Sequence, residues 1–308
     1  MRVLVAPAAL KGVLTAAEAA AAVAAGLERR GVDRHALALA DGGEGTVAAL
    51  CGGDVAARPA HDAFGRPRTA HVGRRGRATV VEAAEVIPFD PQRLDVMSAS
   101  SRGLGELLAR VEADELLVGL GGTANMDGGA GLLEVLIELR APTTVLCDVQ
   151  TTLYDAPRLF GPQKGAGMSD VAELEARLRS RGDLAPYAFL PGSGAAGGLG
   201  AALTSLGARL VPGAAAILEL LGFDPGGFDL VVTGEGRVDA TTAEGKAPAE
   251  VSRRCAAAGV PCVVFGGIVA EQLPGAETIA LSGDPSRARA DLVELGARLG
   301  ARLFDAAG

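Results

Sequence analysis

Aromatic and basic side chains are scarce in this chain of 308 residues. It has no tryptophan, two tyrosines and no run of basic residues, and its formal net charge is −8. Nucleic acids and anionic membranes are bound mainly through clustered positive charge, so neither partner is expected. No apolar stretch approaches the roughly 20 residues that span a bilayer, and the apolar run at the N-terminus is too brief for a signal peptide. The sequence therefore favours a cytoplasmic protein, and its length suggests two domains.

Cysteine and histidine are also rare, with four and three residues. The cysteines form no C-x-x-C pair, so we expect four free thiols in a reducing cytoplasm. The histidines lack metal-ligand spacing, and no Ser/His/Asp or Cys/His set is visible. The phosphate-binding pattern G-x-x-x-x-G-K-[ST] is absent too, which excludes a P-loop kinase at the level of motifs.

Lysine occurs only three times, against 26 arginines. Lys11, Lys164 and Lys246 each lie next to a glycine. Arginine and lysine solvate a surface about equally well, so lysine at only these positions indicates a need for a compact ammonium group. Such a point charge suits a transferring phosphate. Codon bias with chance placement is the alternative.

Short β-branched segments alternate with stretches rich in Ala and Leu along most of the chain. The segments predicted as strands are residues 3–6, 36–40, 116–120, 230–233, 262–265 and 278–281. The predicted helices are residues 15–30, 104–112, 129–139, 247–258 and 287–303. The first helix opens with the capping box Thr15-Ala-Ala-Glu18. This alternation predicts an α/β fold with a doubly wound parallel sheet that helices cover on both faces.

Two regions depart from this alternation. Residues 54–83 contain Arg- and Gly-rich turns between short strands, and residues 141–225 contain one strand, 144–147, followed by loops and helices. We interpret these regions as a smaller, discontinuous second α/β domain. The larger domain then consists of residues 1–53, 84–140 and 226–308.

Glycine-rich turns that carry an acidic residue follow three of the predicted strands. They are residues 41–46, 121–129 and 234–239. In doubly wound sheets ligands bind beyond the carboxyl ends of the strands, where glycine lets the backbone approach an anion closely. Carboxylates beside such turns suit Mg²⁺, which binds them together with substrate phosphates. A single turn could be a structural bend, but three together predict a shared phosphate and metal site.

Three further polar residues lie near strand ends. Asn125 is the only asparagine in the chain, and it could either cap the following helix or contact the substrate. Asp127 could be the helix cap instead. Asp148 directly follows the strand predicted at 144–147 and could face the same cleft.

A formal G-x-G-x-x-G pattern begins at Gly192. The dinucleotide fingerprint needs a strand just before it, whereas Pro191 precedes it here and residues 199–221 look helical. We therefore interpret it as a Gly-rich helix start that binds phosphate or packs tightly, and not as a dehydrogenase motif. Lysines, strand-end acids and glycine turns together indicate phosphate chemistry on a doubly wound scaffold.

Five segments match motifs of a known family, in the family's order and across nearly the whole chain. They are residues 6–12, 41–46, 121–131, 160–166 with 191–200, and 229–248. The most specific are Phe-Gly-Pro-Gln-Lys-Gly-Ala at 160–166 and Thr-Gly-Glu-Gly-Arg-Val-Asp at 233–239. All three lysines lie inside the five segments. In these motifs the chain resembles the bacterial glycerate kinases that lack a P-loop.

The resemblance implies ATP-dependent phosphorylation of D-glycerate, most often to 2-phosphoglycerate, in a cleft between two domains. It implies that one domain is flavodoxin-like and that the smaller one resembles a restriction-endonuclease core. We expect a monomer or a homodimer, with D-glycerate and ATP as its ligands and Mg²⁺ as a cofactor.

The motif match also carries candidate roles onto residues of this chain. Lys11 and Lys246 would neutralise phosphate or the substrate carboxylate, and Asp127 or Asp239 would accept the proton of the glycerate hydroxyl. The candidate substrate contacts are Asn125, Asp148, Lys164 and Arg237. The candidate Mg²⁺ ligands are Asp41, Glu44 and Glu235, and the candidate nucleotide contacts are Gly42, Gly43, Gly194, Gly197 and Gly198.

The chain departs from the family's motifs near the expected substrate. Ala8 and Ala9 stand in place of an acid and a hydroxyl beside Lys11, Met126 stands in place of an amide, and Gln150 begins a Gln-Thr-Thr segment in place of Asp-Asn-Pro. Two alternatives therefore stay open. One is a kinase for a related small hydroxy acid, and the other is a non-catalytic nucleotide or metabolite sensor descended from the kinase.

Overall fold

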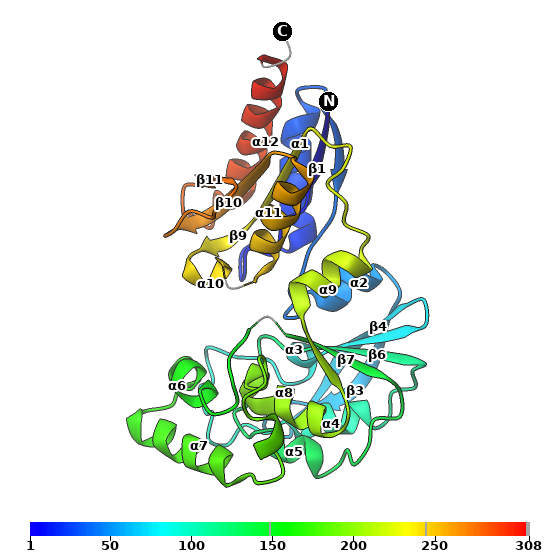
Figure 1. The fold of residues 1–308 in the computed structure, drawn as a ribbon, viewed down its shortest axis with the longest axis vertical. Helices are drawn as coiled ribbons and strands as arrows, with labels where there is room; N and C mark the ends of the chain where they lie inside the picture. Colours follow the sequence, from blue (N-terminus) through cyan, green and yellow to red (C-terminus); the bar gives the residue numbers. More distant parts are fainter. Residues whose placement is uncertain (148, 244, 306–308) are drawn as a thin grey trace. The chain divides into compact units, whose positions relative to one another are not determined.

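The computed structural model describes residues 1–147, 149–243 and 245–305, and its contacts divide the chain into two compact units (Figure 1). Unit 1 combines Met1–Asp41 with Ile217–Gly308. Unit 2 is the continuous segment Gly42–Ala216. No helix in the described part of the chain is long and apolar enough to cross a membrane.

Unit 1 contains a five-stranded parallel sheet. Its strands are β1 (Arg2–Val5), β2 (Asp33–Ala36), β9 (Leu230–Val238), β10 (Cys262–Val269) and β11 (Glu277–Ala280). They lie in the order β11-β10-β9-β1-β2, and every neighbouring pair is parallel. Counted within the unit, this is the order 2-1-3-4-5 of flavodoxin-like, doubly wound sheets. The predicted doubly wound parallel sheet is therefore present in unit 1.

Alternate residues of the central strands form the core on one face of this sheet. Val3, Val5, Val232 and Phe265 are fully buried in one apolar cluster. The cluster includes residues of α1 (Ala16–Glu28) and α12 (Ala288–Asp305). Side chains of a strand alternate between its faces, so a strand that is buried on both sides shows an unbroken apolar run. This explains why the short apolar segments of the sequence located these strands.

The helices of unit 1 begin and pack as their sequences indicate. The capping box predicted for α1 is present, because the Glu18 amide donates to Thr15 Oγ1 and the Thr15 amide donates to Glu18. α1 packs against α12, where a side chain at Gly26 or Gly296 would overlap the backbone of the other helix. α11 (Ala247–Ala258), with the bounds predicted for it, contacts β9 and β10. α10 (Ala240–Ala243) precedes it.

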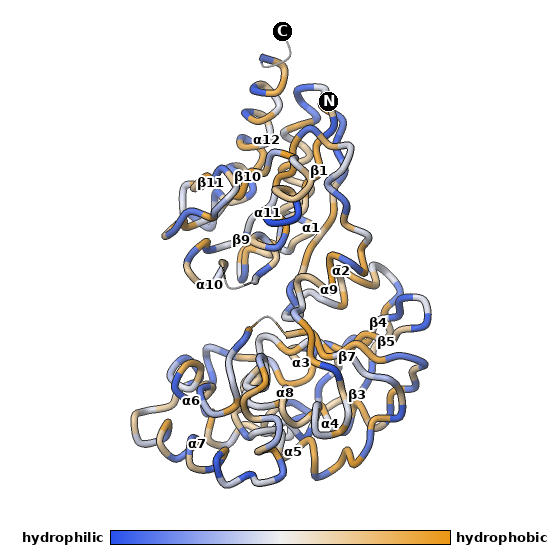
Figure 2. The backbone as a smooth tube through the Cα atoms, viewed as in Figure 1, coloured by the Kyte–Doolittle hydropathy of each residue, from blue (hydrophilic) through white to orange (hydrophobic). Residues whose placement is uncertain are grey.

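Unit 2 contains a six-stranded mixed sheet. Its strands, in their order across the sheet, are β3 (Val55–His61), β4 (Pro67–Arg75), β5 (Ala78–Glu82), β6 (Glu115–Gly119), β7 (Thr143–Cys147) and β8 (Arg209–Pro212). The pairs from β3 to β5 are antiparallel, and those from β5 to β8 are parallel. In Figure 2 the tube is mainly orange, hence apolar, along β7 and β5.

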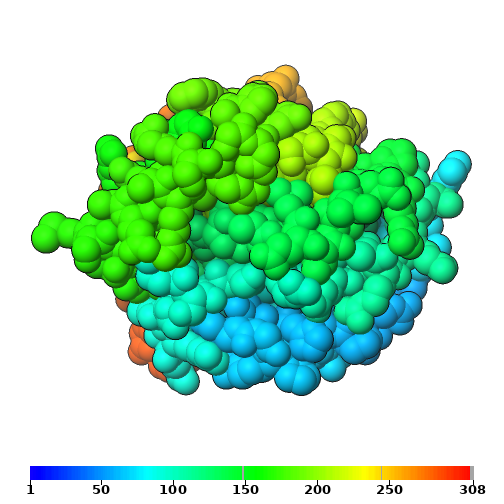
Figure 3. Space-filling model, turned by 90° about the horizontal axis from the view of Figure 1, so that it is seen from below, coloured from blue at the N-terminus to red at the C-terminus, as the bar shows by residue number. Residues whose placement is uncertain are grey.

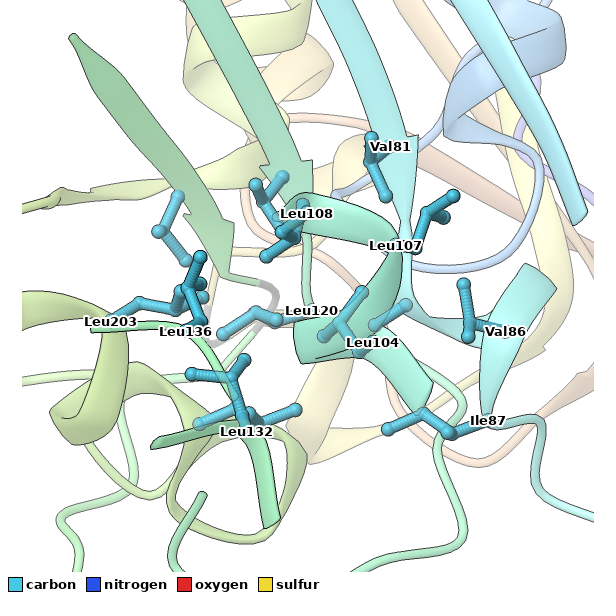
Figure 4. Packing of buried hydrophobic residues seen from close by; sticks show 14 of the residues in the cluster. Val81, Val86, Ile87, Leu104, Leu107, Leu108, Leu120, Leu132, Leu136 and Leu203 are labelled. Atoms are coloured by element: carbon cyan, nitrogen blue, oxygen red, sulfur yellow. The ribbon is translucent and has the colours of Figure 1, made fainter. Parts of the chain in front are cut away.

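Helices and apolar side chains cover this sheet. The helical segments are α2 (Thr46–Cys51), α3 (Ala83–Val86), α4 (Arg102–Leu108), α5 (Ala130–Leu133), α6 (Ala156–Phe160), η1 (Pro162–Lys164), α7 (Met168–Ser180), η2 (Ala185–Tyr187), α8 (Ala195–Ser205) and α9 (Gly213–Leu220), which runs into unit 1. Leu104, Leu120 and Leu132 lie close together in the core that Figure 4 shows. In Figure 3 the colour changes from blue through teal to green across this unit, in line with the contacts of β3 with α4 and of α4 with α5.

The division of the chain differs from the predicted domain boundaries. Residues 84–140 were assigned to the larger, doubly wound domain, but they belong to unit 2 because β6 pairs with β5 on one side and β7 on the other. Residues 42–53 belong to unit 2 as well. Alternation of strands and helices indicates a parallel sheet, but it does not indicate which of two sheets a parallel strand joins.

Three local predictions are also corrected. The second strand covers Asp33–Ala36 instead of residues 36–40, although Leu37 and Leu39 still donate hydrogen bonds to the backbone beside β1. The helix predicted at 129–139 is the short α5. The segment 199–221 is interrupted by the strand β8. The predicted free thiols are confirmed, because all four cysteines are unbridged.

Candidate active site

A pocket of about 350 Å³ lies at the carboxyl edge of the unit 1 sheet. Its lining includes six predicted site residues: Lys11, Asp41, Glu235, Arg237, Asp239 and Lys246. The chain runs from β1 outward to β2 and then returns to β9 on the opposite side of β1, so the strand order reverses between β1 and β9. Ligands of doubly wound sheets bind at such a reversal. The pocket therefore lies where the topology favours a ligand.

Backbone hydrogen bonds hold the loop after β1 against β9. The amides of Ala6 and Ala8 donate to the carbonyls of Val232 and Gly234 at 2.7 and 2.9 Å. Gly234 has no room for a side chain, because a Cβ there would overlap the carbonyl oxygen of Phe265. These contacts place Lys11 on the same pocket wall as the end of β9.

Glu235 is a largely enclosed acid of this pocket, with 13% of its side chain exposed. Thr242 Oγ1 donates to its Oε1 at 2.7 Å, and Lys246 Nζ lies 4.0 Å from its Oε2. Burial raises the pKa of Glu235, and the negative charge of Asp41 raises it further, against the opposite effects of Thr242, Lys246 and Lys11. The two carboxylates make this end of the pocket suitable for a cation.

Asp239 has the opposite electrostatic environment. Thr241 donates to its Oδ1 through both its hydroxyl, at 2.6 Å, and its amide, at 3.0 Å. The guanidinium of Arg237 donates to its Oδ2 at 3.1 Å. The Thr241 hydroxyl is the largest of the causes that hold the pKa of Asp239 below its ordinary value. Asp239 is therefore a carboxylate at neutral pH, with a cationic side chain beside it.

Lys246 stands at the start of α11, where it is the N-cap residue. Helix N-termini favour anions because their first amide groups lack partners within the helix. The ammonium group of Lys246 adds a full positive charge at the same place. The two effects together suit a phosphate group bound in this part of the pocket.

In unit 2 the predicted site residues form a network of their own. Lys164 is buried, with 6% exposed, and its Nζ donates to the carbonyl of Asn125 at 2.7 Å. The amide of Asn125 donates to Asp127 Oδ1 and to the Ala196 carbonyl, both at 3.0 Å. These contacts connect the turn after β6 with the turns before α7 and in α8. Asp148, predicted as a substrate contact, lies outside the described residues.

Protein donors surround the carboxylate of Asp127. It accepts hydrogen bonds from the amide and hydroxyl of Ser101, from the amides of Gly129 and Gly131, and from Asn125. The N-cap of α5 is Gly129, so Asp127 is not the helix cap that the sequence also allowed, although it accepts hydrogen bonds from amides at the start of this helix. Its carboxylate does not line the unit 1 pocket and accepts five hydrogen bonds from the fold, so its geometry gives no support to a role as general base.

The glycines predicted as nucleotide contacts are explained by close packing in unit 2. A Cβ at Gly194, Gly197 or Gly198 would overlap protein atoms of the turns at Thr152, Asn125 and Gly128. No strand directly precedes this segment, so the dinucleotide fingerprint is absent there. Gly42 likewise packs against the backbone of Leu146, Gly43 is buried, and Glu44 is exposed. Of the two alternatives for the Gly-rich helix start, tight packing is the one that the structure shows.

Comparison with known proteins now identifies the family. A family model described as the glycerate kinase family matches residues 3–137 and 137–283. The chain belongs to the glycerate kinase family.

Relatives of this family member cover most of its length. A glycerate kinase from Bacillus subtilis (strain 168) is 32% identical over 328 residues, which cover 87% of this chain and 85% of the relative. A glycerate 2-kinase from Escherichia coli (strain K12) is 31% identical over 311 residues, covering 82% and 81%. A crystal structure assigned to glycerate kinase 2 of Salmonella typhimurium LT2 matches with a TM-score of 0.81 at 28% identity, over 99% of both chains. This glycerate kinase family member is therefore an enzyme of the kinase class.

Sequence reasoning missed one buried acid of this kinase. Glu82 is 3% exposed at the end of β5 and accepts hydrogen bonds from the amides of Gly45 and Val47, at 3.0 and 3.1 Å. Burial raises the pKa of Glu82 to about 7, against the effect of these two amides. The signal was present in the sequence, because Glu82 is an acid at the end of the apolar segment that forms β5. Thr241 and Thr242 were missed as well. Thr241 donates a hydrogen bond to Asp239, and Thr242 donates one to Glu235.

Of the three predicted metal ligands, Asp41 and Glu235 line the unit 1 pocket, whereas Glu44 belongs to unit 2. No group of three or more His, Cys, Asp or Glu side chains within residues 1–147, 149–243 and 245–305 has the arrangement of a metal site. Asp41 and Glu235 both line the unit 1 pocket, and the charge of Asp41 contributes to the raised pKa of Glu235. Mg²⁺ is often held by one or two carboxylates together with substrate phosphates, so such a pair fits it.

Proposed function

We propose that this chain is an ATP-dependent kinase that phosphorylates D-glycerate to 2-phosphoglycerate at the unit 1 pocket. The pair Arg237–Asp239 carries the proposal. A carboxylate that can accept a proton lies 3.1 Å from a guanidinium group that can bind a substrate carboxylate. D-Glycerate has its C2 hydroxyl directly beside its carboxylate, so it presents the complementary pair. Relatives named glycerate kinase and glycerate 2-kinase support the same substrate.

Lys11 and Lys246 would bind the phosphates of ATP. Both line the pocket, and Lys246 adds its charge to that of a helix N-terminus. Phosphoryl transfer asks the protein mainly for positioning and for compensation of the negative charge on the transferring group. Lysine suits this task because its compact ammonium group can follow the phosphate as it moves.

Asp41 and Glu235 would hold Mg²⁺ with the phosphates. Both line the unit 1 pocket, and the charge of Asp41 contributes to the raised pKa of Glu235, which places the two carboxylates within electrostatic reach of each other. When bound, Mg²⁺ would supply positive charge to the phosphate oxygens. Glu44 and Asn125, by contrast, stay predictions as ligand contacts, as does the resemblance of unit 2 to a restriction-endonuclease core.

Asp239 would accept the proton of the C2 hydroxyl while Arg237 holds the substrate carboxylate. Hydrogen bonds from Thr241 keep Asp239 ionised and fix its orientation. The side chain of Arg237 is 59% exposed, so its remaining N–H groups are accessible to a substrate. Asp127, the other predicted base, is held by donors of unit 2 and would act as a structural residue.

The proposal is tested by incubating the purified protein with Mg·ATP and D-glycerate. ADP release would be followed with a coupled assay, and NMR would identify the phosphorylated carbon. Formation of 2-phosphoglycerate would support the proposal, whereas 3-phosphoglycerate would contradict the arrangement of Arg237 and Asp239. If ADP forms only with another hydroxy acid, Ala8 and Ala9 beside Lys11 are the first candidates for the changed specificity. ATP binding without turnover on any hydroxy acid would indicate a sensor.

A further inference from the structure

The unit 1 pocket has two chemically different halves along the edge of the sheet. The charged half discussed above consists of Lys11, Asp41, Glu235, Arg237, Asp239 and Lys246. Beyond β9 the lining continues past β10 and β11 to the start of α12, mainly with glycines and apolar side chains: Gly267, Ile268, Leu281, Gly283, Pro285 and Ala288. The proposed phosphate and glycerate contacts do not account for this second half.

Two apolar side chains of the pocket are unusually exposed for their elements. Ile268 on β10 is 49% exposed, although residues 262–266 of the same strand are buried. Val13, in the turn after β1, is 38% exposed. Single exposed apolar residues are ordinary on protein surfaces. These two line one cavity with Leu281 and Pro285, so they offer exposed apolar surface within the pocket.

The two halves differ in their charged groups, because the first combines the three cations Lys11, Arg237 and Lys246 with three acids, whereas the second contributes two acids to the lining. The acids of the second half, Asp284 and Asp291, are each held by a serine: Ser286 donates to Asp284, and Ser282 donates to Asp291. Those hydrogen bonds hold the pKa of both carboxyls below their ordinary values, so the second half is negative at neutral pH. Arg287, the cation of this region, pairs with Asp291 at 3.4 Å. A triphosphate is therefore repelled from this half and attracted to the lysines.

The length of the pocket suits an extended ligand. From β1 to β11 there are three intervals between neighbouring strands, which is about 14 Å at the usual strand spacing. Glycines at positions 236, 267 and 283 leave the floor between the halves without side chains. An extended nucleoside triphosphate has a comparable length, with its charge at one end and a flat, weakly polar base at the other.

We propose that the half formed by Val13, Ile268, Leu281 and Pro285 binds the adenosine end of ATP, with the triphosphate directed toward Lys11 and Lys246. This inference rests on the proposed use of ATP and specifies how the nucleotide lies in the pocket. The apolar wall covers the base, and the carboxylate of Asp284, which is exposed at the mouth, is available to the ribose hydroxyls.

The test separates the two ends of the nucleotide by using adenosine and inorganic tripolyphosphate as individual competitors of ATP. In Ile268→Glu a charge without a partner would lie against the base, so we expect the Kd values of ATP and adenosine to rise about tenfold or more. The Kd of tripolyphosphate and the KM for D-glycerate should stay at the wild-type values. If Ile268→Glu fails to fold, Val13→Glu should reproduce this pattern, because Val13 lines the same pocket from a different segment of the chain.

Phe304→Glu is the matched control. Phe304 on α12 is 49% exposed, the same fraction as Ile268, and does not line the pocket. It should leave the affinities for all three ligands unchanged.

The possible outcomes distinguish this inference from the proposed function. Wild-type turnover of glycerate, with adenosine affinity unchanged in Ile268→Glu and Val13→Glu, would overturn the inference alone. A rise in the KM for glycerate or in the Kd of tripolyphosphate, without loss of adenosine affinity, would show the reverse arrangement and overturn it too. Loss of ATP and adenosine affinity in a protein that never phosphorylates glycerate would support the nucleoside site and contradict the proposed function.

Discussion

The two units use similar residues in opposite ways. In unit 1, Glu235 and Lys246 line a pocket and lie 4.0 Å apart, too far for a hydrogen bond. In unit 2, Asp127 accepts hydrogen bonds from five donor groups, and Lys164 is buried with its ammonium group on a backbone carbonyl. Both sets belong to the Gly-rich segments that the sequence marks as motifs. Such a segment can therefore supply an acid to a pocket or to a network within the fold, and the motif alone does not distinguish the two.

The largest expected effect is on turnover, from Lys246→Ala. Loss of one group that stabilises the transferring phosphate commonly lowers kcat by about 10²–10³-fold, and we expect a loss in that range. Lys246→Arg should recover little, because a planar guanidinium does not replace a compact ammonium group at such a site. Steady-state kinetics with Mg·ATP and D-glycerate would measure both variants. Circular dichroism should show an unchanged fold, since Lys246 makes no side-chain cap of α11.

Wild-type activity in Lys246→Ala would contradict the proposal that this pocket binds the phosphates of ATP. Lys164 provides the contrast within the same chain. Lys164→Met should act mainly through stability, because removal of its ammonium group leaves the Asn125 carbonyl without that donor.

The next largest effects are expected from two aspartates, one of which should affect mainly stability and the other mainly turnover. Asp127→Ala should lower the free energy of unfolding by about 2–4 kcal/mol, since several buried donors lose their acceptor at once. Asp239→Ala should instead lower kcat by about 10²-fold or more while its unfolding free energy changes little. Chemical denaturation and kinetics on both variants would measure the two quantities. If Asp127→Ala stays as stable as the wild type but loses turnover, Asp127 is the base and the comparison between the units fails.

The helices and strands of unit 1 could be predicted from the sequence better than the hydrogen-bond network of unit 2. Apolar runs, the capping box at Thr15 and the bounds of α11 follow from interactions within a few residues, which a single sequence reveals. The strand β8 was missed because it is only four residues long, partly exposed and ends in a proline. Asp127 accepts a hydrogen bond from Ser101, 26 residues earlier, and Asn125 donates one to Ala196, 71 residues later. Such distant partners leave no periodic signal.

A smaller effect is expected from the buried acid of unit 2. The pKa of Glu82 is raised from 4.5 to about 7 in the folded protein, so the native state holds a proton that the unfolded chain has already released. The stabilisation from this group is present below about pH 4.5 and is lost as the pH rises through about 7. The difference amounts to at most about 3 kcal/mol. Glu82→Gln cannot ionise, so its stability relative to the wild type should rise between pH 5 and pH 8.

Thermal denaturation across this pH range would measure the difference. Glu115→Gln is a suitable control, because Glu115 is exposed at the start of β6 and is not among the groups that shift the pKa of Glu82. A wild type and a Glu82→Gln variant with parallel pH profiles would show that Glu82 is already ionised in the native state.

The smallest effect is expected from Thr241, whose hydrogen bonds lower the pKa of Asp239 in the unit 1 pocket. The hydroxyl of Thr241 is the largest cause of the lowered pKa of Asp239, and Arg237 and Lys246 contribute less. Thr241→Ala removes that hydroxyl and keeps the backbone amide, so the pKa of Asp239 should rise. If Asp239 accepts the substrate proton, the acidic limb of the kcat/KM profile must move to higher pH, with little change at the plateau. Thr241→Ser should restore the wild-type limb. An acidic limb that does not move in Thr241→Ala, while Asp239→Ala is inactive, would show that Asp239 holds or orients the substrate without taking its proton.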